Sequence, residues 1–235
     1  MFTASAAHYD LIYSTFKNYA GEVAQIASLL RQLNPECRTI LDVACGTGEH
    51  ARLLAVQGFI VDGLDLDPAF VRIAQQKHPL GRFFQADMSD FHLPYRYDAV
   101  LCLFSSIGYL KTLDRVRRAL TCFREHLAPG GVLLIEPWFP PDVLDPKRVS
   151  TNVGEAKGVR VTRVTRVEIE DNISRLHFDY EITDSNGTTR ASEIHELGLF
   201  TKAEMLRAFE EAELQVEHDP VGLTDRGLYV ARIAA

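Results

Sequence analysis

Long hydrophobic runs are missing from this chain of 235 residues. No stretch of about 18 apolar residues occurs, whereas a transmembrane helix needs about 20. Near the N-terminus, Asp10 interrupts the sequence before the hydrophobic core of a signal peptide could form. We therefore expect a soluble, cytoplasmic protein that has no membrane partner.

Runs of positive charge are missing as well. The formal net charge is -7 at pH 7, the isoelectric point is about 5.6, and like charges never occur in runs of five. Proteins that bind nucleic acids usually present clustered Lys and Arg side chains to the phosphates. The composition therefore argues against a nucleic-acid partner, whereas an apolar share of 46% is sufficient for an ordinary globular core.

Cysteine is scarce and irregularly spaced. Its four copies, at positions 37, 45, 102 and 122, form no C-x-x-C pair. Paired cysteines are the usual sign of a zinc site or of a disulfide framework. We therefore expect reduced thiols and no bound metal.

The most informative feature that is present is a glycine-rich turn between a strand and a helix. Residues 41–48 read Leu-Asp-Val-Ala-Cys-Gly-Thr-Gly, and the apolar run over 38–44 predicts a strand buried on both faces. Good helix formers over 49–57 predict a helix directly after the turn. Glycines in the turn can take positive φ and let a ligand lie on the backbone. This combination predicts a nucleoside-binding site.

Two classes of ligand use such a turn. The spacing Gly46-x-Gly48-x-x-Ala51 also fits the dinucleotide pattern G-x-G-x-x-G/A. A carboxylate beside the turn would repel a pyrophosphate, but it suits the positive sulfonium and the amino group of S-adenosylmethionine (SAM). Asp42 and the nearby Glu49 therefore favour SAM over NAD.

Two further aspartates end predicted strands. Asp65 ends a strand over 59–65, where an acidic residue can accept both ribose hydroxyls of an adenosine. The alternative, a cap for the next helix, suits Asp67 better because a proline follows it. Asp87 ends a short strand that begins at Phe83, and its carboxylate could accept from the adenine amino group or could simply be solvated in a loop.

Strands and helices alternate along the first 136 residues. Further strands are predicted over 97–104 and 132–136, and Pro129-Gly130-Gly131 should end the helix between them. One face of that helix is predicted to carry Leu113, Val116, Leu120, Phe123 and Leu127. This alternation indicates a parallel sheet, with its binding edge at the carboxyl ends of the strands. The residues expected at that edge are Asp42, Asp65, Asp87, Phe104 and Glu136.

The pattern changes after residue 150. Strands are predicted over 159–170 and 173–184, and a third runs towards Phe200 after an Asn-Gly hairpin signal. We interpret 149–200 as an antiparallel insertion that acts as a lid and dimer contact, between core segments 1–148 and 201–235. Thr201 and Glu204 form a capping-box pattern, which predicts a helix, and two closing strands should follow.

Several stretches of the chain are typical of one enzyme family. Residues 41–48 resemble motif I of the class I SAM methyltransferases, and the more specific segments are Phe-Ser-Ser-Ile-Gly-Tyr-Leu at 104–110, Glu-Pro-Trp at 136–138 and Arg-Gly-Leu at 226–228. With these segments the whole chain resembles the SAM-dependent N,N-dimethyltransferases of nucleotide-linked 3-amino-3,6-dideoxyhexoses in desosamine and mycaminose biosynthesis. The resemblance implies an α/β Rossmann-like fold: a seven-stranded, mostly parallel sheet in the order 3-2-1-4-5-7-6, with the insertion between strands 5 and 6.

The resemblance also implies roles for individual residues. Tyr109 would accept or relay the proton of the acceptor amine, or pack on the cofactor as an aromatic lid, and His195 is a weaker relay candidate. The implied SAM-binding residues are Tyr9, Tyr19, Asp42, Ala44, Gly46, Gly48, Asp65, Leu66, Asp87, Met88, Leu103 and Phe104. The implied substrate-binding residues are Ser106, Glu136, Trp138 and Arg226.

Some of these roles have structural alternatives. Trp138 could stack on a ligand or belong to the core, and Glu136 could hold the substrate or cap a loop. Arg226 would pair with a nucleotide diphosphate or would be a surface arginine. The chain departs from the family at Phe2, near which relatives have an additional tyrosine that touches the sugar.

The leading hypothesis is methyl transfer from SAM to the amine of a small molecule, with a dTDP-linked amino sugar as the favoured acceptor. The alternatives are O- or C-methylation of another metabolite, and a SAM-binding module without transfer activity. Methylation of a DNA amine is disfavoured, because Phe104-Ser105-Ser106 replaces the Asn/Asp-Pro-Pro-aromatic motif of those enzymes.

Overall fold

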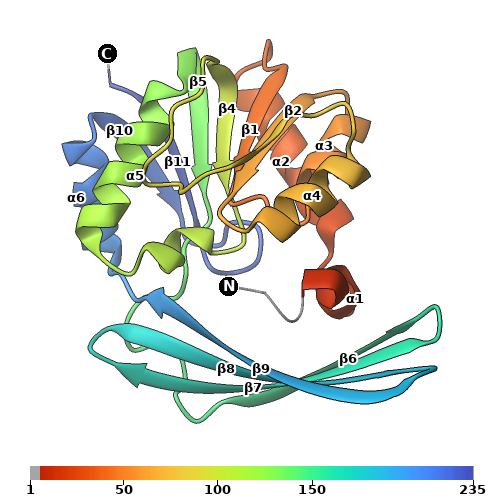
Figure 1. Cartoon of the computed structure of the whole chain (residues 1–235). Helices are drawn as coiled ribbons and strands as arrows, with labels where there is room; N and C mark the ends of the chain where they lie inside the picture. Colours follow the sequence, from red (N-terminus) through yellow and green to blue (C-terminus); the bar gives the residue numbers. More distant parts are fainter. Residues whose placement is uncertain (1–5, 235) are drawn as a thin grey trace.

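Two β-sheets and a short N-terminal helix between them form the framework of the molecule (Figure 1). The computed structural model describes residues 6–234, so that Phe2 lies outside the described residues. Among the described residues, no helix is both long and apolar enough to cross a membrane.

The larger sheet has seven strands. They are β1 (Thr39–Val43), β2 (Ile60–Asp65), β3 (Phe83–Gln85), β4 (Tyr97–Cys102), β5 (Leu127–Ile135), β10 (Leu214–Asp219) and β11 (Leu228–Ile233). Their order in space is β3-β2-β1-β4-β5-β11-β10, and β11 runs antiparallel to both of its neighbours. This is the predicted order 3-2-1-4-5-7-6, so the predicted fold class is confirmed.

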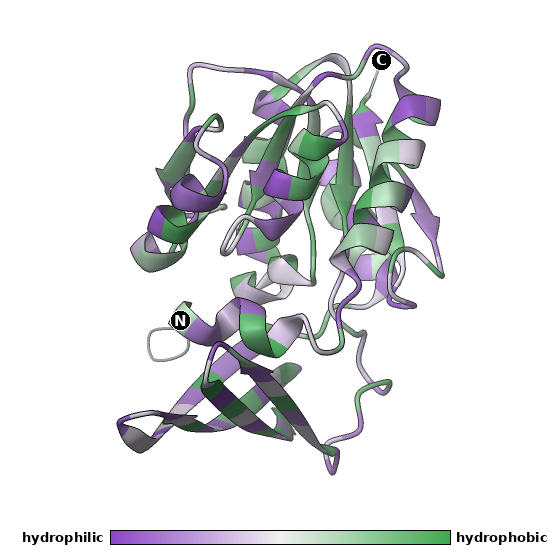
Figure 2. Ribbon diagram, turned by 90° about the vertical axis from the view of Figure 1, so that its right-hand side faces the viewer, coloured by the Kyte–Doolittle hydropathy of each residue, from purple (hydrophilic) through white to green (hydrophobic). Residues whose placement is uncertain are grey.

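Helices cover both faces of this sheet (Figure 1). They are α2 (Tyr19–Leu33), α3 (Glu49–Val56), α4 (Pro68–Lys77), α5 (Leu113–Glu125) and α6 (Lys202–Glu211). The short helices η1 (Ala6–His8) and α1 (Tyr9–Tyr13) lie between the two sheets, and η2 (Ser106–Leu110) lies in the connection between β4 and α5. Side chains alternate along the strands, so Ala99 and Leu101 of β4 pack with α2 and α3, while Val100 and Cys102 pack with α5 and α6. Figure 2 shows the resulting hydrophobic strands between amphipathic helices.

The capping patterns behave as the sequence predicts. Thr201 and Glu204 form the capping box of α6, and Asp67 caps α4 with Pro68 at its first turn.

The boundary between α5 and β5 is different from the prediction. The helix ends at Glu125, and Leu127 already pairs with Tyr97 as the first residue of β5, so the predictions that Leu127 lies on the helix and that Pro129-Gly130-Gly131 ends it are wrong. Leu127 is completely buried where it pairs with β4. This burial favours the strand over the helix that the spacing of apolar residues predicted.

The second sheet is antiparallel and has four strands. They are β6 (Val149–Ala156), β7 (Val159–Glu170), β8 (Ile173–Asp184) and β9 (Gly187–Gly198), paired in sequence order. The turn between β7 and β8, at Asp171-Asn172, has positive φ at both residues, as a tight hairpin requires. Sequence reasoning missed β6, because its mostly exposed, polar residues have no clear alternation of hydrophobicity.

The two faces of this inserted sheet differ. Its inner face contributes Val161, Val167, Leu176 and Phe178 to an apolar cluster beneath α1. At Gly154 a Cβ would lie 2.5 Å from the carbonyl oxygen of Leu11, so that only glycine lets α1 approach the sheet this closely. The outer face carries ion pairs, among them Arg166 with Asp179, Arg175 with Glu196 and Arg190 with Glu181.

Candidate active site

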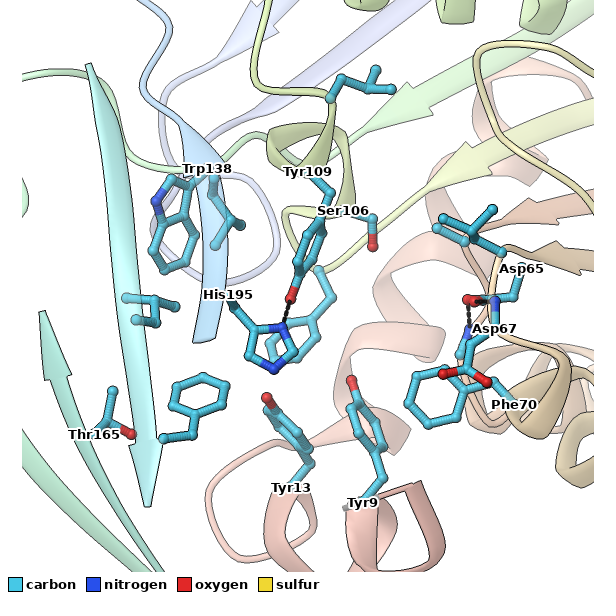
Figure 3. A pocket seen from close by; sticks show the side chains of 18 of the residues that line it. Tyr9, Tyr13, Asp65, Asp67, Phe70, Ser106, Tyr109, Trp138, Thr165 and His195 are labelled. Carbon is cyan, nitrogen blue, oxygen red and sulfur yellow. Dashed lines mark hydrogen bonds between the residues drawn. The ribbon is translucent and has the colours of Figure 1, made fainter. Parts of the chain in front are cut away.

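A cavity of about 500 Å³ lies between the carboxyl edge of the large sheet and the inner face of the inserted sheet. Tyr9 and Tyr13 of α1 point into it from one side, and Tyr109 and Trp138 face it from the other (Figure 3). The strand-end loops and the inserted sheet therefore enclose one continuous space.

The turn after β1 leaves its backbone open to this space. Ala44, Gly46 and Gly48 have φ of 56°, 55° and 75°. A Cβ on Gly48 would lie 2.8 Å from the Cβ of Ala74, so this glycine allows α3 and α4 to pack closely. At Gly46, nothing lies within 4 Å of the position that a Cβ would take, and the residue lines the cavity. A ligand can therefore lie directly against the peptide groups there.

Asp65 holds this turn in place. Its Oδ2 accepts from the backbone N–H of Gly46 at 2.8 Å, and its Oδ1 accepts from that of Asp67 at 2.9 Å (Figure 3). Burial raises the pKa of Asp65, although the two N–H groups oppose this shift. Each carboxylate oxygen can accept more than one hydrogen bond, so Asp65 can hold the turn and still accept from the hydroxyls of a ribose.

Asp42 is a second buried carboxylate near the turn. It is 2% exposed, and its Oδ2 has no hydrogen-bond partner among the described residues. Burial raises its pKa to about 6, although the charges of His50 and Lys17 oppose this shift. Among the described residues Asp42 is not part of the cavity wall. A buried carboxylate without a partner is unfavourable, so Asp42 is suited to a cationic ligand group.

A buried ion cluster lies beside Asp42. The Nζ of Lys17 is 2.6 Å from Glu22 Oε2, and the same oxygen is 2.9 Å from His50 Nε2. Burial lowers the pKa of Lys17, although Glu22 opposes this shift. Tyr19 packs edge-on against His50, with ring centroids 5.0 Å apart. Tyr19 thus belongs to this cluster, and it is not among the described residues that line the cavity.

Asp87 lines the cavity at the end of the sheet that carries β3. Its Oδ2 accepts from Arg115 Nη2 at 2.6 Å, and its Oδ1 accepts from the N–H and the hydroxyl of Ser89. Burial alone would raise the pKa of Asp87, but the bonds from Ser89 and Arg115 outweigh it and lower the pKa. Asp87 is therefore a charged acceptor held in a fixed orientation.

Glu136 connects two loops beneath the cavity. It is fully buried, and its Oε2 accepts from the backbone N–H of Phe104 at 2.6 Å. Its Oε1 accepts from the Thr224 hydroxyl. Phe104 and Ser105 both have positive φ, an uncommon conformation for these residues that Glu136 helps to hold. Among the described residues Glu136 is not part of the cavity wall.

Tyr109 and His195 meet in the middle of the cavity. The Tyr109 hydroxyl lies 3.0 Å from His195 Nδ1, and His195 Nε2 lies 3.4 Å from Glu193 Oε2 (Figure 3). Burial raises the pKa of Tyr109 well above its ordinary value. Burial also lowers the pKa of His195, although Glu193 opposes this shift. At neutral pH the centre of the cavity therefore holds a phenol and a neutral imidazole.

Two arginines, Arg163 and Arg226, also line the cavity. Arg226 donates to Ser105 Oγ at 2.9 Å and lies 5.8 Å from the ring of Trp138. Arg163 of β7 is 5% exposed, with its guanidinium 4.6 Å from the ring of Phe178. The Trp138 indole N–H donates to Ser174 Oγ at 2.9 Å. Both arginines thus place positive charge beside aromatic rings.

Twelve of the predicted site residues line the cavity: Tyr9, Ala44, Gly46, Asp65, Leu66, Asp87, Met88, Phe104, Ser106, Tyr109, Trp138 and Arg226. The other five do not line the cavity: Tyr19, Asp42, Gly48, Leu103 and Glu136. Sequence reasoning missed Tyr13, Arg115 and Arg163. A signal for Arg163 did exist, because this residue shares one face of its strand with the apolar Val161 and Val167.

These residues fit SAM. The open backbone at Gly46 leaves room for a nucleoside, and the carboxylates of Asp65 and Asp87 offer acceptors for hydroxyl and amino groups on the cavity wall. In the described part of the chain, no group of three or more His, Cys, Asp or Glu side chains is arranged to hold a metal ion.

Known proteins agree with this assignment. Residues 40–131 match the family model described as a methyltransferase domain. The dTDP-3-amino-3,4,6-trideoxy-alpha-D-glucopyranose N,N-dimethyltransferase of Streptomyces venezuelae is 38% identical over 94% of this chain and 94% of its own length. The structure of DesVI from Streptomyces venezuelae has a TM-score of 0.93 at 38% identity, over 99% of both chains. SAM-bound CalS10 from Micromonospora echinaspora, an amino pentose methyltransferase, has a TM-score of 0.85 at 33% identity, over 98% of this chain and 97% of its own.

The similarity covers nearly the whole chain, including the inserted sheet. It therefore confirms the predicted family, the methyltransferase activity and the dependence on SAM. The chain belongs to the family of SAM-dependent N,N-dimethyltransferases that includes the Streptomyces venezuelae enzyme.

Proposed function

We propose that this methyltransferase transfers methyl groups to the amine of a nucleotide-linked deoxyamino sugar. The observation that carries the proposal is the set of groups that line the cavity: the carboxylates of Asp65 and Asp87, the phenol of Tyr109 and the guanidinium groups of Arg163 and Arg226. A small molecule that carries an amine and an anionic tail matches this set of groups. The S. venezuelae relative acts on a dTDP-linked amino sugar, as its name states.

The diphosphate is assigned to the two arginines. A guanidinium is planar and carries five N–H donors, so it suits phosphate oxygens. Arg226 donates one of these bonds to Ser105. Arg163 is almost fully buried, and its Nε and Nη1 have no hydrogen-bond partner among the described residues. A buried cation without full pairing is unfavourable, so an anionic ligand would stabilise this end of the site.

The protein contributes alignment to the reaction. Bound SAM supplies a methyl group on a positively charged sulfur and leaves as a neutral thioether. Asp65 and the open backbone at Gly46 would bind and orient the nucleoside, while Trp138 and Phe139 would help to exclude water around the acceptor. The Tyr109 oxygen would accept from an amine N–H and so fix the direction of the nitrogen lone pair.

We expect Asp42→Asn to stabilise the ligand-free protein and to weaken SAM binding. The pKa of Asp42 is about 6 in the folded protein, compared with an ordinary value of 3.8. The folded state therefore favours protonated Asp42, and this contribution to stability is lost as the pH rises from about 4 to about 6. Because asparagine stays neutral, the variant should be more stable at pH 8 by on the order of 2 to 3 kcal/mol.

Urea unfolding and calorimetric SAM titration test both effects. At pH 8 the variant should unfold at higher urea and bind SAM about tenfold more weakly, since it lacks a carboxylate for the cation. Near pH 4 the two proteins should have similar stability. Equal SAM affinity in variant and wild type at pH 8 would remove Asp42 from the cofactor site.

The acceptor is tested by direct assay. The purified protein is incubated with SAM and a panel of dTDP-3-amino- and dTDP-4-amino-dideoxyhexoses, and mass spectrometry counts the methyl groups added. We expect two methyl groups on at least one sugar. If SAM binds in the same samples but no sugar is methylated, the acceptor lies outside this class, and O- or C-methylation or a binding role must be considered.

We also propose that the enzyme works in the cytoplasm as a homodimer joined through the inserted sheet. All four cysteines are free thiols and three are buried, as expected in a reducing compartment. Val149, Val153 and Ile194 expose apolar surface on this sheet, and β6 and β9 are its edge strands. Sedimentation equilibrium tests the dimer, and a monomer at micromolar concentration would contradict it.

A further inference from the structure

A closed ring of hydrogen bonds links Asp87, Ser89 and Arg115 at the wall of the cavity. Arg115 Nη2 donates to Asp87 Oδ2 at 2.6 Å and to Ser89 Oγ at 3.1 Å. The Ser89 hydroxyl donates to Asp87 Oδ1 at 2.7 Å, and the backbone N–H of Ser89 donates to the same oxygen at 2.8 Å. Asp87 and Arg115 line the cavity, and Ser89 is buried. The ring therefore joins the loop after β3 to the helix α5.

Arg115 occupies a position that the helix itself does not favour for an arginine. It is the third residue of α5, which begins at Leu113. The first turn of a helix carries partial positive charge, so a cation there is unfavourable unless it has a partner. Asp87 supplies that partner from 28 residues away in the chain. The pairing with this carboxylate, and not the helix, thus accounts for an arginine at this position.

The chemistry of the three groups assigns every hydrogen in the ring. A carboxylate only accepts, and Ser89 has a single hydroxyl hydrogen, which points to Asp87. The two hydrogens on Arg115 Nη2 therefore serve Asp87 Oδ2 and Ser89 Oγ. Burial alone would raise the pKa of Asp87, but the bonds from Ser89 and Arg115 outweigh it and lower the pKa. Asp87 is thus an ionised carboxylate that has no hydrogen to offer a ligand.

One acceptor position of Asp87 is left for the cavity. A carboxylate has about four such positions, and the bonds from Arg115 and from the N–H and hydroxyl of Ser89 fill all but one of them. The open position lies on Oδ2, which accepts only from Arg115 among the described residues. A ligand amino group can donate to it, whereas a ligand carbonyl oxygen would face a negative charge. Adenine carries an exocyclic amino group where hypoxanthine carries a carbonyl oxygen, so the ring can distinguish these two bases.

We propose that Arg115 is a positioning residue that makes the cofactor site specific for adenine, by holding Asp87 as an ionised acceptor for the exocyclic amino group. Arg115 fixes one carboxylate oxygen and Ser89 fixes the other, so that Asp87 can turn only by breaking these bonds. The proposal rests on SAM as the cofactor and is independent of the amine acceptor.

A ratio of two binding constants tests the proposal without any acceptor. S-adenosylhomocysteine, which SAM becomes after methyl transfer, differs from S-inosylhomocysteine only at the group in question, so effects elsewhere in the site cancel in the ratio. We expect the wild type to bind S-inosylhomocysteine on the order of 100-fold more weakly, because a hydrogen bond to a charged group is lost and a repulsion takes its place. In Arg115→Ala, S-adenosylhomocysteine should bind about tenfold more weakly and S-inosylhomocysteine nearly unchanged, so the ratio should fall to about 10.

Arg117→Ala is the matched control for this titration. Arg117 lies on the same helix and pairs with Asp114 and Glu211, and it is not among the described residues that line the cavity. Alanine favours helix formation, so both variants should fold, and only Arg115→Ala should lower the ratio. An unchanged ratio in Arg115→Ala, or equal binding of the two ligands by the wild type, would overturn the proposal.

A double-mutant cycle shows whether Arg115 acts through Asp87. Asp87→Asn keeps an oxygen but adds an N–H₂ group that can serve a carbonyl oxygen, so this variant alone should lower the ratio. Adding Arg115→Ala to Asp87→Asn should then leave the ratio where it is, because the carboxylate that Arg115 positions is gone. Full additivity of the two effects would mean that Arg115 acts independently of Asp87, and it would refute the positioning role.

Discussion

Asp65→Ala is expected to weaken SAM binding on the order of 100-fold. The Asp65 carboxylate accepts from the backbone N–H groups of Gly46 and Asp67, so its removal releases the turn after β1. It also removes the acceptor assigned to the ribose hydroxyls. Hydrogen bonds to a charged group each contribute about 1.5 to 3 kcal/mol, and the loss of two is sufficient for this effect. Calorimetric titration of SAM measures it.

Asp98→Ala is the matched control for this experiment. Its Oδ2 also accepts from two backbone N–H groups, those of Arg38 and Thr39, both at 2.9 Å. Asp98 lies at the opposite edge of the same sheet, where β1 and β4 begin. Both variants should lose stability in urea, but only Asp65→Ala should lose SAM affinity. Similar SAM affinities in the two variants would show that Asp65 supports the fold and does not bind the ribose.

Arg226→Ala is expected to raise the KM for a nucleotide-linked amino sugar on the order of 100-fold. The lost contact is a charge-assisted, two-pronged interaction with phosphate oxygens. This contact is remote from the reacting nitrogen, so kcat should change little. SAM affinity should change less than threefold by calorimetry, since Arg226 contacts Ser105 and the rings of Phe104 and Trp138. Steady-state kinetics at saturating SAM give the KM.

Two comparisons make this result specific to the diphosphate. Arg232→Ala is the control variant, because Arg232 is an exposed arginine that donates to the Leu33 carbonyl away from the cavity. The same amino sugar without its nucleotide is the control substrate, and Arg226→Ala should hardly affect its KM. Equal increases for the two substrates, or an equal loss of SAM affinity, would contradict a diphosphate role for Arg226.

The part of the cavity that we assign to the cofactor was largely predictable from the sequence because its geometry is local. A strand, a turn with glycines at 46 and 48, and a helix form one continuous segment, and positive φ at both glycines is a property of that segment. Asp65 follows from the same logic, since a parallel strand must return to the same edge of the sheet through a right-handed crossover. The capping roles of Asp67 and Thr201 are local as well.

The acceptor half depends on pairing between distant segments. Glu136 was predicted at the cavity edge, but Phe104 and Thr224 converge on it and bury it. Tyr109 and His195 are 86 residues apart and meet only because the inserted sheet covers η2. The position of Arg163 on the inner face of β7 depends on the strand register, in which it faces Tyr180 of β8. No short segment contains this information.

The amino-acid sequence by itself determined the class of fold, the strand order, the cofactor and the residues of the glycine turn. The alternation of strands and helices and the glycine turn follow from hydrophobic periodicity and from backbone conformations that few residue types adopt, and both are properties of neighbouring residues. The strand order followed from the resemblance to a known family. The tertiary structure alone decided that Arg115 and Arg163 reach the cavity, that His195 pairs with Tyr109 and Glu193, and that Glu136 and Asp42 are buried. The physical reason is that burial and partner choice depend on the register and packing of segments far apart in the chain, whose contacts form together when the two sheets enclose the cavity.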